Sequence, residues 1–226
     1  MTTARRPFPG AWLSGLVASD QAPRHLAEYF RPVAPEEAAG YTGSRFERLG
    51  GGGDRPETAD TVTADDLVAV QTLSVSVPSR VALDLLEGGL GRDLRELLRR
   101  VPRDLDMADA ARTDLDRNSP AHAAWELLRG QDKVGWVVAG KILARKRPRL
   151  VPVYDSVVRC ALGAPREFWL GLHGALRADG RALHTGLLEL RDRAGVPGTV
   201  GALRVCDVLI WKHHRDTHRK RGCPGV

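Results

Sequence analysis

Apolar residues recur every three to four positions along most of the chain, which is the spacing of amphipathic helices and not of strands. Glycine and proline interrupt this pattern and set the expected ends of the helices. The expected helical segments are 23–30, 63–73, 79–88, 90–101, 120–128, 134–147, 155–162, 165–178, 181–194 and 200–211. Only residues 74–77 alternate like a strand, and that stretch is short. The pattern predicts an all-α fold with helices packed in two adjoining lobes.

The length of the chain sets its domain organisation. A chain of 226 residues can bury one core or two small lobes. We expect residues 1–226 to form a single bilobal helical domain, in which 24–118 and 164–215 pack around a hairpin and helix core at 119–163. Prolines and glycines make the segment before residue 24 irregular, and 216–226 is expected to be a frayed basic tail.

One stretch, from Lys133 to Ser156, organises the rest of the chain. It predicts a tight turn, a helix, a basic break, a short extended piece and a second helix. Gly135 in the turn suits a backbone position without a Cβ or with positive φ. Pro148 ends the first helix, because a residue before proline disfavours helical geometry. Asp155 opens the second helix, where aspartate is a common N-cap.

This order of elements resembles the helix-hairpin-helix DNA glycosylase superfamily. In that family, an apolar-Pro-Gly-Val-Gly hairpin holds a DNA phosphate, and a later aspartate lines the pocket for the base. Gly135 matches the second hairpin glycine and Asp155 matches the aspartate, within a similar region at 119–163. Lys133 replaces the first hairpin glycine, and Val137 stands where bifunctional members carry a lysine. The resemblance therefore implies a monofunctional enzyme without Schiff-base chemistry.

The resemblance implies that Asp155 is the catalytic residue. A carboxylate there would stabilise the oxocarbenium-like state of glycosidic cleavage or orient a water molecule. The alternative is that Asp155 only caps its helix. A base that leaves the stack enters an aromatic or apolar pocket, and Trp136 and Tyr154 are the expected walls. Residues 41–46 contain a further aromatic and basic cluster, which would stack on a base or pin its loop to the core: Tyr41, Arg45 and Phe46.

The same resemblance gives a set of residues for binding nucleic acid. The hairpin would hold a phosphate through backbone N–H groups at a helix N-terminus. A basic run at the end of the next helix, 145–149, would follow the phosphate backbone if its side chains faced one way; otherwise it is a solubilising helix end. Lys141 would either extend along the edge of the core or pair with Asp155. The expected binding residues are Lys133, Val134, Gly135, Lys141, Arg145 and Lys146.

The whole chain also resembles an uncharacterised actinobacterial family that is known only as a domain of unknown function. Three stretches carry this second resemblance, and they are 41–50, 63–67 and 153–155. It implies no activity. A glycine run at 50–53 has two further interpretations: it is either a flexible connector or a loop whose N–H groups cradle a phosphate.

Composition narrows the class of protein. Apolar residues make up 42% of the chain and charged residues 27%, which is typical of a globular protein. We expect no membrane span, a cytoplasmic location and a monomer; three scattered cysteines suit a reducing compartment. The net charge of +6 comes largely from arginine, whose guanidinium matches phosphate. The expected partner is DNA, or else a nucleoside or nucleotide.

The C-terminal segment contains a possible zinc pattern in His213, His214, His218 and Cys223. His214 and His218 are one helical turn apart, which suits two ligands. No Cys-x-x-Cys accompanies them, so no metal and no cofactor are expected. The sequence thus leads to two hypotheses, a monofunctional N-glycosylase acting on a modified base and a non-catalytic nucleic-acid-binding helix-hairpin-helix module.

Overall fold

The computed structural model describes residues 7–31 and 40–220, and these residues form helices and connecting loops. The α-helices are α1 (Gly10–Val17), α2 (Ala22–Phe30), α3 (Ala64–Gln71), α4 (Ser79–Glu87), α5 (Gly89–Leu98), α6 (Pro120–Arg129), α7 (Trp136–Lys146), α8 (Ser156–Ala161), α9 (Phe168–Arg193) and α10 (Ala202–Lys220). Short 3₁₀ helices are η1 (Thr42–Arg45), η2 (Leu49–Gly51) and η3 (Arg112–Asp114). The described part of the chain contains no strand, so the all-α prediction is confirmed.

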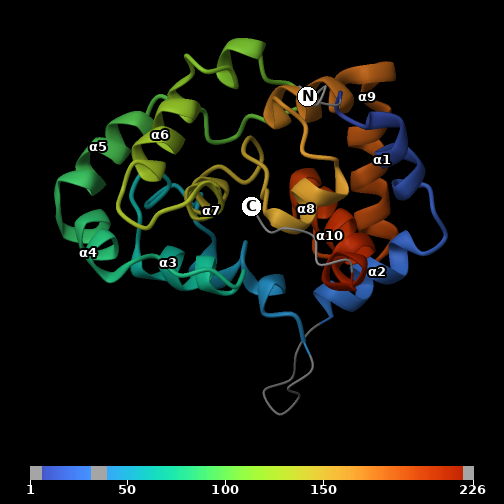
Figure 1. The fold of residues 1–226 in the computed structure, drawn as a ribbon, viewed down its shortest axis with the longest axis horizontal. Coiled ribbons are helices and arrows are strands. Elements are labelled where there is room, and N and C mark those ends of the chain that lie inside the picture. The colour runs from blue at the N-terminus through green and yellow to red at the C-terminus, as the bar shows by residue number, and fades with distance from the viewer. Residues whose placement is uncertain (1–6, 32–39, 221–226) are drawn as a thin grey trace.

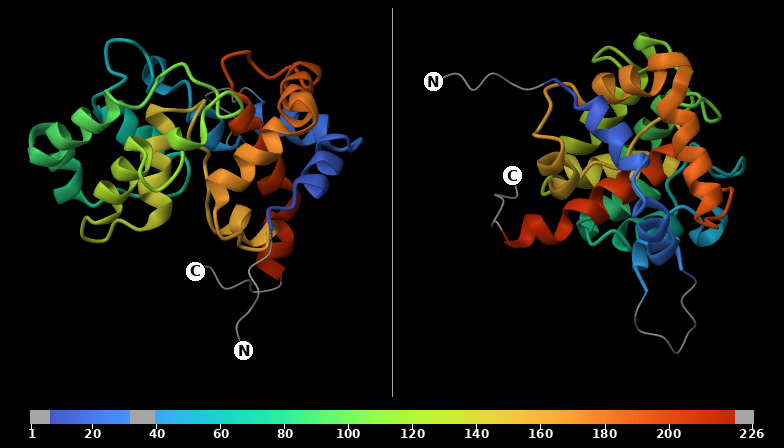
Figure 2. Two further views of the ribbon diagram at one scale, coloured as in Figure 1. Left: turned by 90° about the horizontal axis from the view of Figure 1, so that it is seen from above. Right: turned by 90° about the vertical axis from the view of Figure 1, so that its right-hand side faces the viewer.

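The helices form two groups that lie side by side. Helices α3 to α7 make one group, and α1 and α2 pack with α8, α9 and α10 in the other (Figure 1). The view from above shows the same division, with both ends of the described chain in one group (Figure 2). The chain crosses to the first group between α2 and α3 and returns to the second group after α7. Helix α2 thus packs with the C-terminal helices α9 and α10, and α8 packs against α10.

Local signals explain where several helices begin and break. Thr63 caps α3 in a capping box with Asp66, and Ser119 caps α6 just before Pro120. Helix α9 is interrupted at residues 178–181, where Asp179, Gly180 and Arg181 have positive φ. The predicted break between 178 and 181 is thus confirmed, although the two halves form one element.

Two predictions at the ends of the chain are wrong. Residues 10–17 form α1, and Leu13, Leu16 and Val17 bury their side chains in the core. Helix α10 continues to residue 220, so the first part of the expected tail is helical. Helix α1 forms because it packs against α9 and α10. The burial of its apolar side chains outweighs the low helix propensity of this segment.

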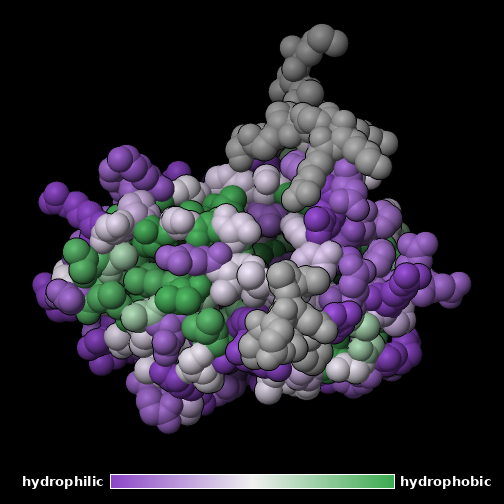
Figure 3. Space-filling view, turned by 90° about the horizontal axis from the view of Figure 1, so that it is seen from below, coloured by the Kyte–Doolittle hydropathy of each residue, from purple (hydrophilic) through white to green (hydrophobic). Residues whose placement is uncertain are grey.

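Apolar side chains also reach the surface on the half formed by α3 to α7. The face seen from below carries a large apolar area on this side (Figure 3). Val68 on α3 and Leu83 and Leu86 on α4 are exposed large apolar residues. None of these three side chains lines either cavity described next.

Candidate functional site: two cavities on either side of helix α7

Helix α7 separates two cavities and contributes side chains to both. Trp136 and Gly140 line one cavity, and Val137 and Lys141 line the other. Residues four apart lie on the same face of a helix, so each pair faces one side. The larger space, of about 760 Å³, is here called the aromatic cavity, and the smaller, of about 360 Å³, the acid cavity.

The acid cavity lies where the two groups of helices meet. Its lining comes from α2, the loop before η1, the segment after α3, α7, α8 and α10. Three aromatic rings form one wall: Tyr29 stacks on Tyr41 with centroids 4.9 Å apart, and Trp211 meets both rings edge-on. The charged lining consists of Lys141, Asp155, Arg204, Asp207 and Arg215.

Asp155 both caps a helix and borders the acid cavity. Its Oδ1 atom accepts hydrogen bonds of 3.0 Å from the backbone N–H groups of Val157 and Val158. Its Oδ2 atom lies 3.8 Å from Lys141 Nζ, and 20% of the side chain is exposed. One oxygen is therefore fixed by the start of α8, and the other faces a cation at the cavity.

Lys141 is the cation held closest to this acid. Its side chain is only 4% exposed, and its Nζ donates a hydrogen bond of 2.9 Å to Leu73 O. Burial lowers the pKa of Lys141, and Asp155 acts in the opposite direction. Lys141 was also expected among the residues that bind nucleic acid, but its amine faces a backbone carbonyl and Asp155. The alternative, pairing with Asp155, matches the structure.

A second buried pair, Arg204 and Asp207, borders the same cavity. Arg204 Nη1 donates to both carboxylate oxygens of Asp207, at 2.9 and 2.6 Å. Its Nη2 atom donates to the Tyr29 hydroxyl at 2.7 Å and to Gly43 O at 2.9 Å. Burial raises the pKa of Asp207 to about 7, and Arg204 opposes that shift. The cavity thus combines one solvent-reached carboxylate with one deeply buried carboxylate.

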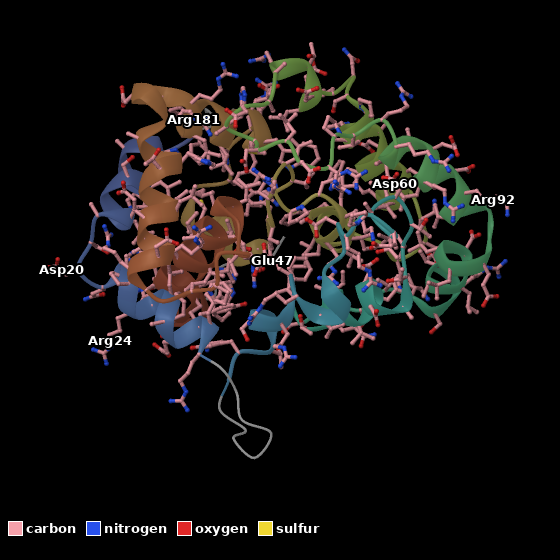
Figure 4. All side chains as sticks on the ribbon, turned by 180° about the vertical axis from the view of Figure 1, so that it is seen from behind. Asp20, Arg24, Glu47, Asp60, Arg92 and Arg181 are labelled. Atoms are coloured by element: carbon pink, nitrogen blue, oxygen red, sulfur yellow. The ribbon has the colours of Figure 1, made fainter. Side chains whose placement is uncertain are left out.

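Glu47 adds a third carboxyl group near the junction of the two helix groups. It lies near the middle of the molecule, whereas Arg92, Asp20 and Arg24 lie at the periphery (Figure 4). Its Oε2 atom is buried and has no hydrogen-bond partner among the described residues. Burial raises the pKa of Glu47 to about 8, with Arg204 acting against the shift. This carboxyl group is therefore held largely protonated at neutral pH.

The aromatic cavity has a different character. Tyr154 stacks on Phe168 with centroids 3.8 Å apart and also contacts Trp136 at 5.3 Å. The guanidinium of Arg159 lies 5.7 Å from the centre of the Trp136 ring. Burial raises the pKa of Tyr154 to about 12, so its hydroxyl stays protonated. Other aromatic members of the lining are His122, Trp125 and Trp169.

The prediction that Trp136 and Tyr154 form walls around Asp155 is wrong. Tyr154 and Asp155 are adjacent in an extended segment, where successive side chains point to opposite sides. Trp136 lies on the other face of α7 from Val137. Residues that are neighbours in the sequence therefore line two different cavities.

The aromatic and basic cluster predicted at residues 41–46 is also divided. Tyr41 lines the acid cavity, and its hydroxyl accepts hydrogen bonds from Lys212 at 3.1 Å and Arg215 at 3.0 Å. Phe46 is 1% exposed and packs in the core, so it is not a wall of a pocket. Arg45 is exposed and lines neither cavity. Of the two interpretations, pinning the loop to the core describes Phe46.

The predicted hairpin forms between α6 and α7. Lys133 is exposed and has a φ of 59°, a left-handed value that usually favours glycine. Val134 is buried, and Gly135 is the N-cap of α7 with an extended backbone. The required left-handed position is thus Lys133, the residue that replaces the first hairpin glycine. A Cβ placed on Gly135 would meet no atom within 4 Å.

The basic run at the end of α7 is buried, contrary to the prediction for Arg145 and Lys146. Arg145 Nε lies 2.9 Å from Asp66 Oδ1, and Lys146 Nζ lies 2.8 Å from Asp66 Oδ2. Arg145 also donates to the carbonyl oxygens of Phe46 and Leu49. These cations hold the segment around η1 and η2 against α3 and α7, so they are not available to follow a phosphate backbone.

The next two arginines of this run differ from each other. Arg147 is buried and donates to Val101 O, Ala59 O and Asp60 Oδ1, at 2.9, 2.7 and 2.6 Å. Arg149 is nearly half exposed and pairs with Asp106. The run is therefore mainly a set of internal connections between the middle loops and α7.

The glycine run is neither a free connector nor an open cradle. Gly50, Gly51 and Gly52 have positive φ, and Gly53 is buried. A Cβ on Gly53 would lie 2.4 Å from Arg145 O and 2.8 Å from Asp66 Oδ1. The run is thus a close-packed cover over the pair formed by Arg145 and Asp66, and glycine is needed for that approach.

Sequence reasoning missed most of the acid cavity. Arg204 and Asp207 were part of a segment interpreted only as an apolar helix, although a charged pair three residues apart interrupts its apolar run. That interruption was the available signal, because buried charges occur mainly in pairs. Tyr29 and Trp211 carry no comparable signal, since aromatic residues on apolar helix faces usually belong to the core.

The fold and site define an all-α protein with a charged cavity at the junction of two helix groups. Within the described residues, 7–31 and 40–220, no helix is long and apolar enough to cross a bilayer. The chain belongs to the DUF6308 family, a family of unknown function, whose model matches residues 22–214. Comparisons with curated proteins and with solved structures found no match.

Proposed function

We propose that the protein hydrolyses the N-glycosidic bond of a nucleobase and uses the carboxylate of Asp155 in the acid cavity. The observation that carries this proposal is that the two carboxylate oxygens of Asp155 have different partners. Oδ1 is held by the backbone of α8, while Oδ2 lies beside Lys141 at a cavity walled by Tyr29, Tyr41 and Trp211. A carboxylate that only capped the helix would need no adjoining cavity.

The chemistry follows from this arrangement. As the bond between the sugar and the base breaks, positive charge develops on the sugar, and the carboxyl group of Asp155 would stabilise it. A water molecule forms the new bond to the anomeric carbon and loses a proton. The base leaves with the bonding electron pair and gains a proton. Stacking on Tyr41 and Trp211 would hold the base during cleavage.

The absence of a lysine at Val137 favours hydrolysis without a covalent intermediate. Val137 lines the acid cavity and cannot form a Schiff base. Lys141 is one turn further along and is already bonded to Leu73 O and placed near Asp155. In this proposal, Lys141 orients the carboxylate that does the chemistry.

The test is release of a base by wild type and by Asp155→Asn. The substrates are DNA duplexes and single strands with alkylated, deaminated or oxidised bases, together with free nucleosides. We expect wild type to release a base from at least one substrate, and Asp155→Asn to lower the rate by about 10²–10⁴-fold. Asparagine caps helices as well as aspartate does, so the variant should fold normally. Asp132→Asn, in the hairpin, is the matched control and should keep full activity.

Two results would contradict the proposal. One is the absence of base release by wild type from the whole panel, DNA and nucleosides alike. The other is equal release by wild type and Asp155→Asn. Far-UV circular dichroism and urea unfolding of both proteins separate a catalytic effect from a loss of fold.

A second candidate function is a nucleic-acid-binding module without catalysis. The observation that favours it is the aromatic cavity, which is lined by Trp136, the first residue of α7 after the hairpin, with Arg159 beside that ring. Aromatic rings with nearby arginines bind single-stranded bases by stacking. Binding to a labelled oligonucleotide that weakens steeply with salt, with no base release, would support this function over hydrolysis.

A further inference from the structure

We propose that Cys160, His214 and His218 form a zinc site with one open coordination position. Cys160 lies on α8, and the two histidines lie on α10, which packs against α8 (Figure 1 and Figure 2). One potential ligand atom from each residue lies within 4.8 Å of the others. His214 and His218 belong to the zinc pattern seen in the sequence, whose Cys223 lies outside the described residues. Cys160 was not part of that pattern, and no metal was expected.

The types of ligand specify the kind of metal. Thiolate and imidazole together favour Zn²⁺ over Mg²⁺ or Ca²⁺, which prefer oxygen. Tetrahedral zinc with bonds of about 2.0–2.3 Å places its ligand atoms roughly 3.3–3.6 Å apart. Small rotations of the three side chains would close the present separations. Three protein ligands leave the fourth position for water or a bound molecule.

The helix geometry prepares the two histidines for this role. His214 and His218 are four residues apart, so their side chains lie on the same face of α10. Their ring centroids are 5.8 Å apart, with an angle of 56° between the ring planes. In addition, the Nδ1 atom of His218 is buried with no hydrogen-bond partner in the described part of the chain. A buried polar atom without a partner costs free energy, and metal binding at this ring would offset that cost.

The surroundings permit a cation to enter. Each of the three residues is partly exposed to solvent. The neighbouring cation Arg215 is engaged elsewhere: its guanidinium lies 4.6 Å from the Trp211 ring centre and donates to the Tyr41 hydroxyl. His218 also lines the acid cavity. The open coordination position would therefore lie at the edge of the cavity that contains Asp155.

The zinc site is independent of the proposed glycosidic chemistry, because Asp155 is not one of its ligands. The test uses full-length protein stripped with a chelator and then titrated with ZnCl₂ or CoCl₂. We expect one zinc ion per chain and, with Co²⁺, thiolate-to-metal charge-transfer absorption in the near ultraviolet. Zinc should also raise the melting temperature, because it joins α8 to α10.

Variants show which residues hold the metal. Cys160→Ser should remove the charge-transfer band and raise the Kd for zinc by more than about 100-fold, since loss of outer-shell partners alone costs 10–100-fold. His218→Gln should raise the Kd similarly. His213→Gln is the matched control: His213 adjoins His214 but packs on Trp12, and binding should be unchanged. Asp155→Asn should also keep its zinc, which separates failure of this inference from failure of the proposed hydrolase.

Absence of zinc binding by wild type would overturn the inference. So would a Cys160→Ser protein that keeps both the charge-transfer band and its zinc affinity. If Cys160→Ser does not fold, His218→Gln decides the question, because His218 lies near the end of α10. Unchanged zinc affinity in a folded His218→Gln would then be the contradicting result.

Discussion

Two sets of buried charges on α7 are built from the same residue types and serve different purposes. At the end of the helix, Arg145 and Lys146 share Asp66, and Arg145 also bonds to backbone carbonyls. In the middle of the helix, Lys141 lies beside Asp155 at a cavity. The first set is closed by the protein itself, and the second has room for another molecule.

This difference shows why burial of a charge does not by itself mark a functional site. A buried ion pair contributes little net stability compared with apolar packing, but removal of one partner is costly. The closed set therefore acts as a structural connection between η2, α3 and α7. The open set borders a cavity with aromatic walls, where the same electrostatics would act on the substrate of the proposed reaction.

The largest effect is expected for Asp66→Ala. This change leaves the cations of Arg145 and Lys146 buried without their carboxylate, which should lower the free energy of unfolding by about 3–5 kcal/mol. Urea denaturation followed by circular dichroism measures the change. Asp65→Ala is the matched control, because Asp65 is next in sequence and about half exposed, 3.9 Å from Arg55. It should cost no more than about 1 kcal/mol; equal losses in both variants would refute the closed set as a structural connection.

The second prediction sharpens the contrast between the two faces of α7. Trp136→Ala should weaken binding of a single-stranded oligonucleotide by about 1–3 kcal/mol, because it removes a stacking ring. It should leave base release at saturating substrate unchanged. Val137→Met, one residue away, fills the acid cavity and should impair base release while leaving oligonucleotide binding intact. Fluorescence anisotropy and the release assay provide the two measurements, and parallel losses in both variants would show that the cavities form one site.

The sequence predicted the helices because apolar spacing depends on local geometry. It placed breaks near 178–181 and opened helices at Ser119 and Asp155, where capping residues carry the signal. It could not assign residues to cavities, because Arg145 meets Asp66 across 79 positions of sequence. It also treated Trp136, Tyr154 and Asp155 as one site, although Trp136 and Tyr154 line the aromatic cavity and Asp155 lines the acid cavity. Contacts over such distances are decided by packing, which a single sequence does not show.

A third prediction concerns Glu47, whose pKa is influenced by Arg145 of the closed set and by Arg204 at the acid cavity. Its pKa is raised to about 8 by burial, so the folded protein binds a proton that the unfolded chain releases at lower pH. The contribution of this proton to the free energy of unfolding is complete below the pKa of glutamate in the unfolded chain. It is lost as the pH rises toward 8. The expected slope in that interval is at most about −1.4 kcal/mol per pH unit.

Glu47→Gln should flatten this slope and stabilise the protein at pH 8 relative to wild type. Urea midpoints measured between pH 5 and pH 8.5 test the prediction. Glu57→Gln is the matched control, since Glu57 is exposed and should leave the slope as it is. A Glu47→Gln protein with the same slope as wild type would mean that another group dominates.

The smallest effect is expected for Gly135→Ala. This variant tests whether glycine is needed there for the fold of the hairpin or for binding a phosphate. Gly135 has an extended backbone, and an added Cβ would meet no atom within 4 Å. Gly135→Ala should therefore leave stability unchanged or raise it by about 0.4–1 kcal/mol, through a less flexible unfolded chain. Nothing in the folded protein thus requires glycine here, but a phosphate approaching the N-terminus of α7 would. Weaker oligonucleotide binding by a fully stable Gly135→Ala protein would support the hairpin as a phosphate site.

Gly130→Ala, before the turn, is the comparison variant. Equal binding by wild type and Gly135→Ala would leave the exposed Lys133 as the hairpin's sole expected contribution, and Lys133→Gln should then reduce the salt dependence of binding by about one phosphate contact.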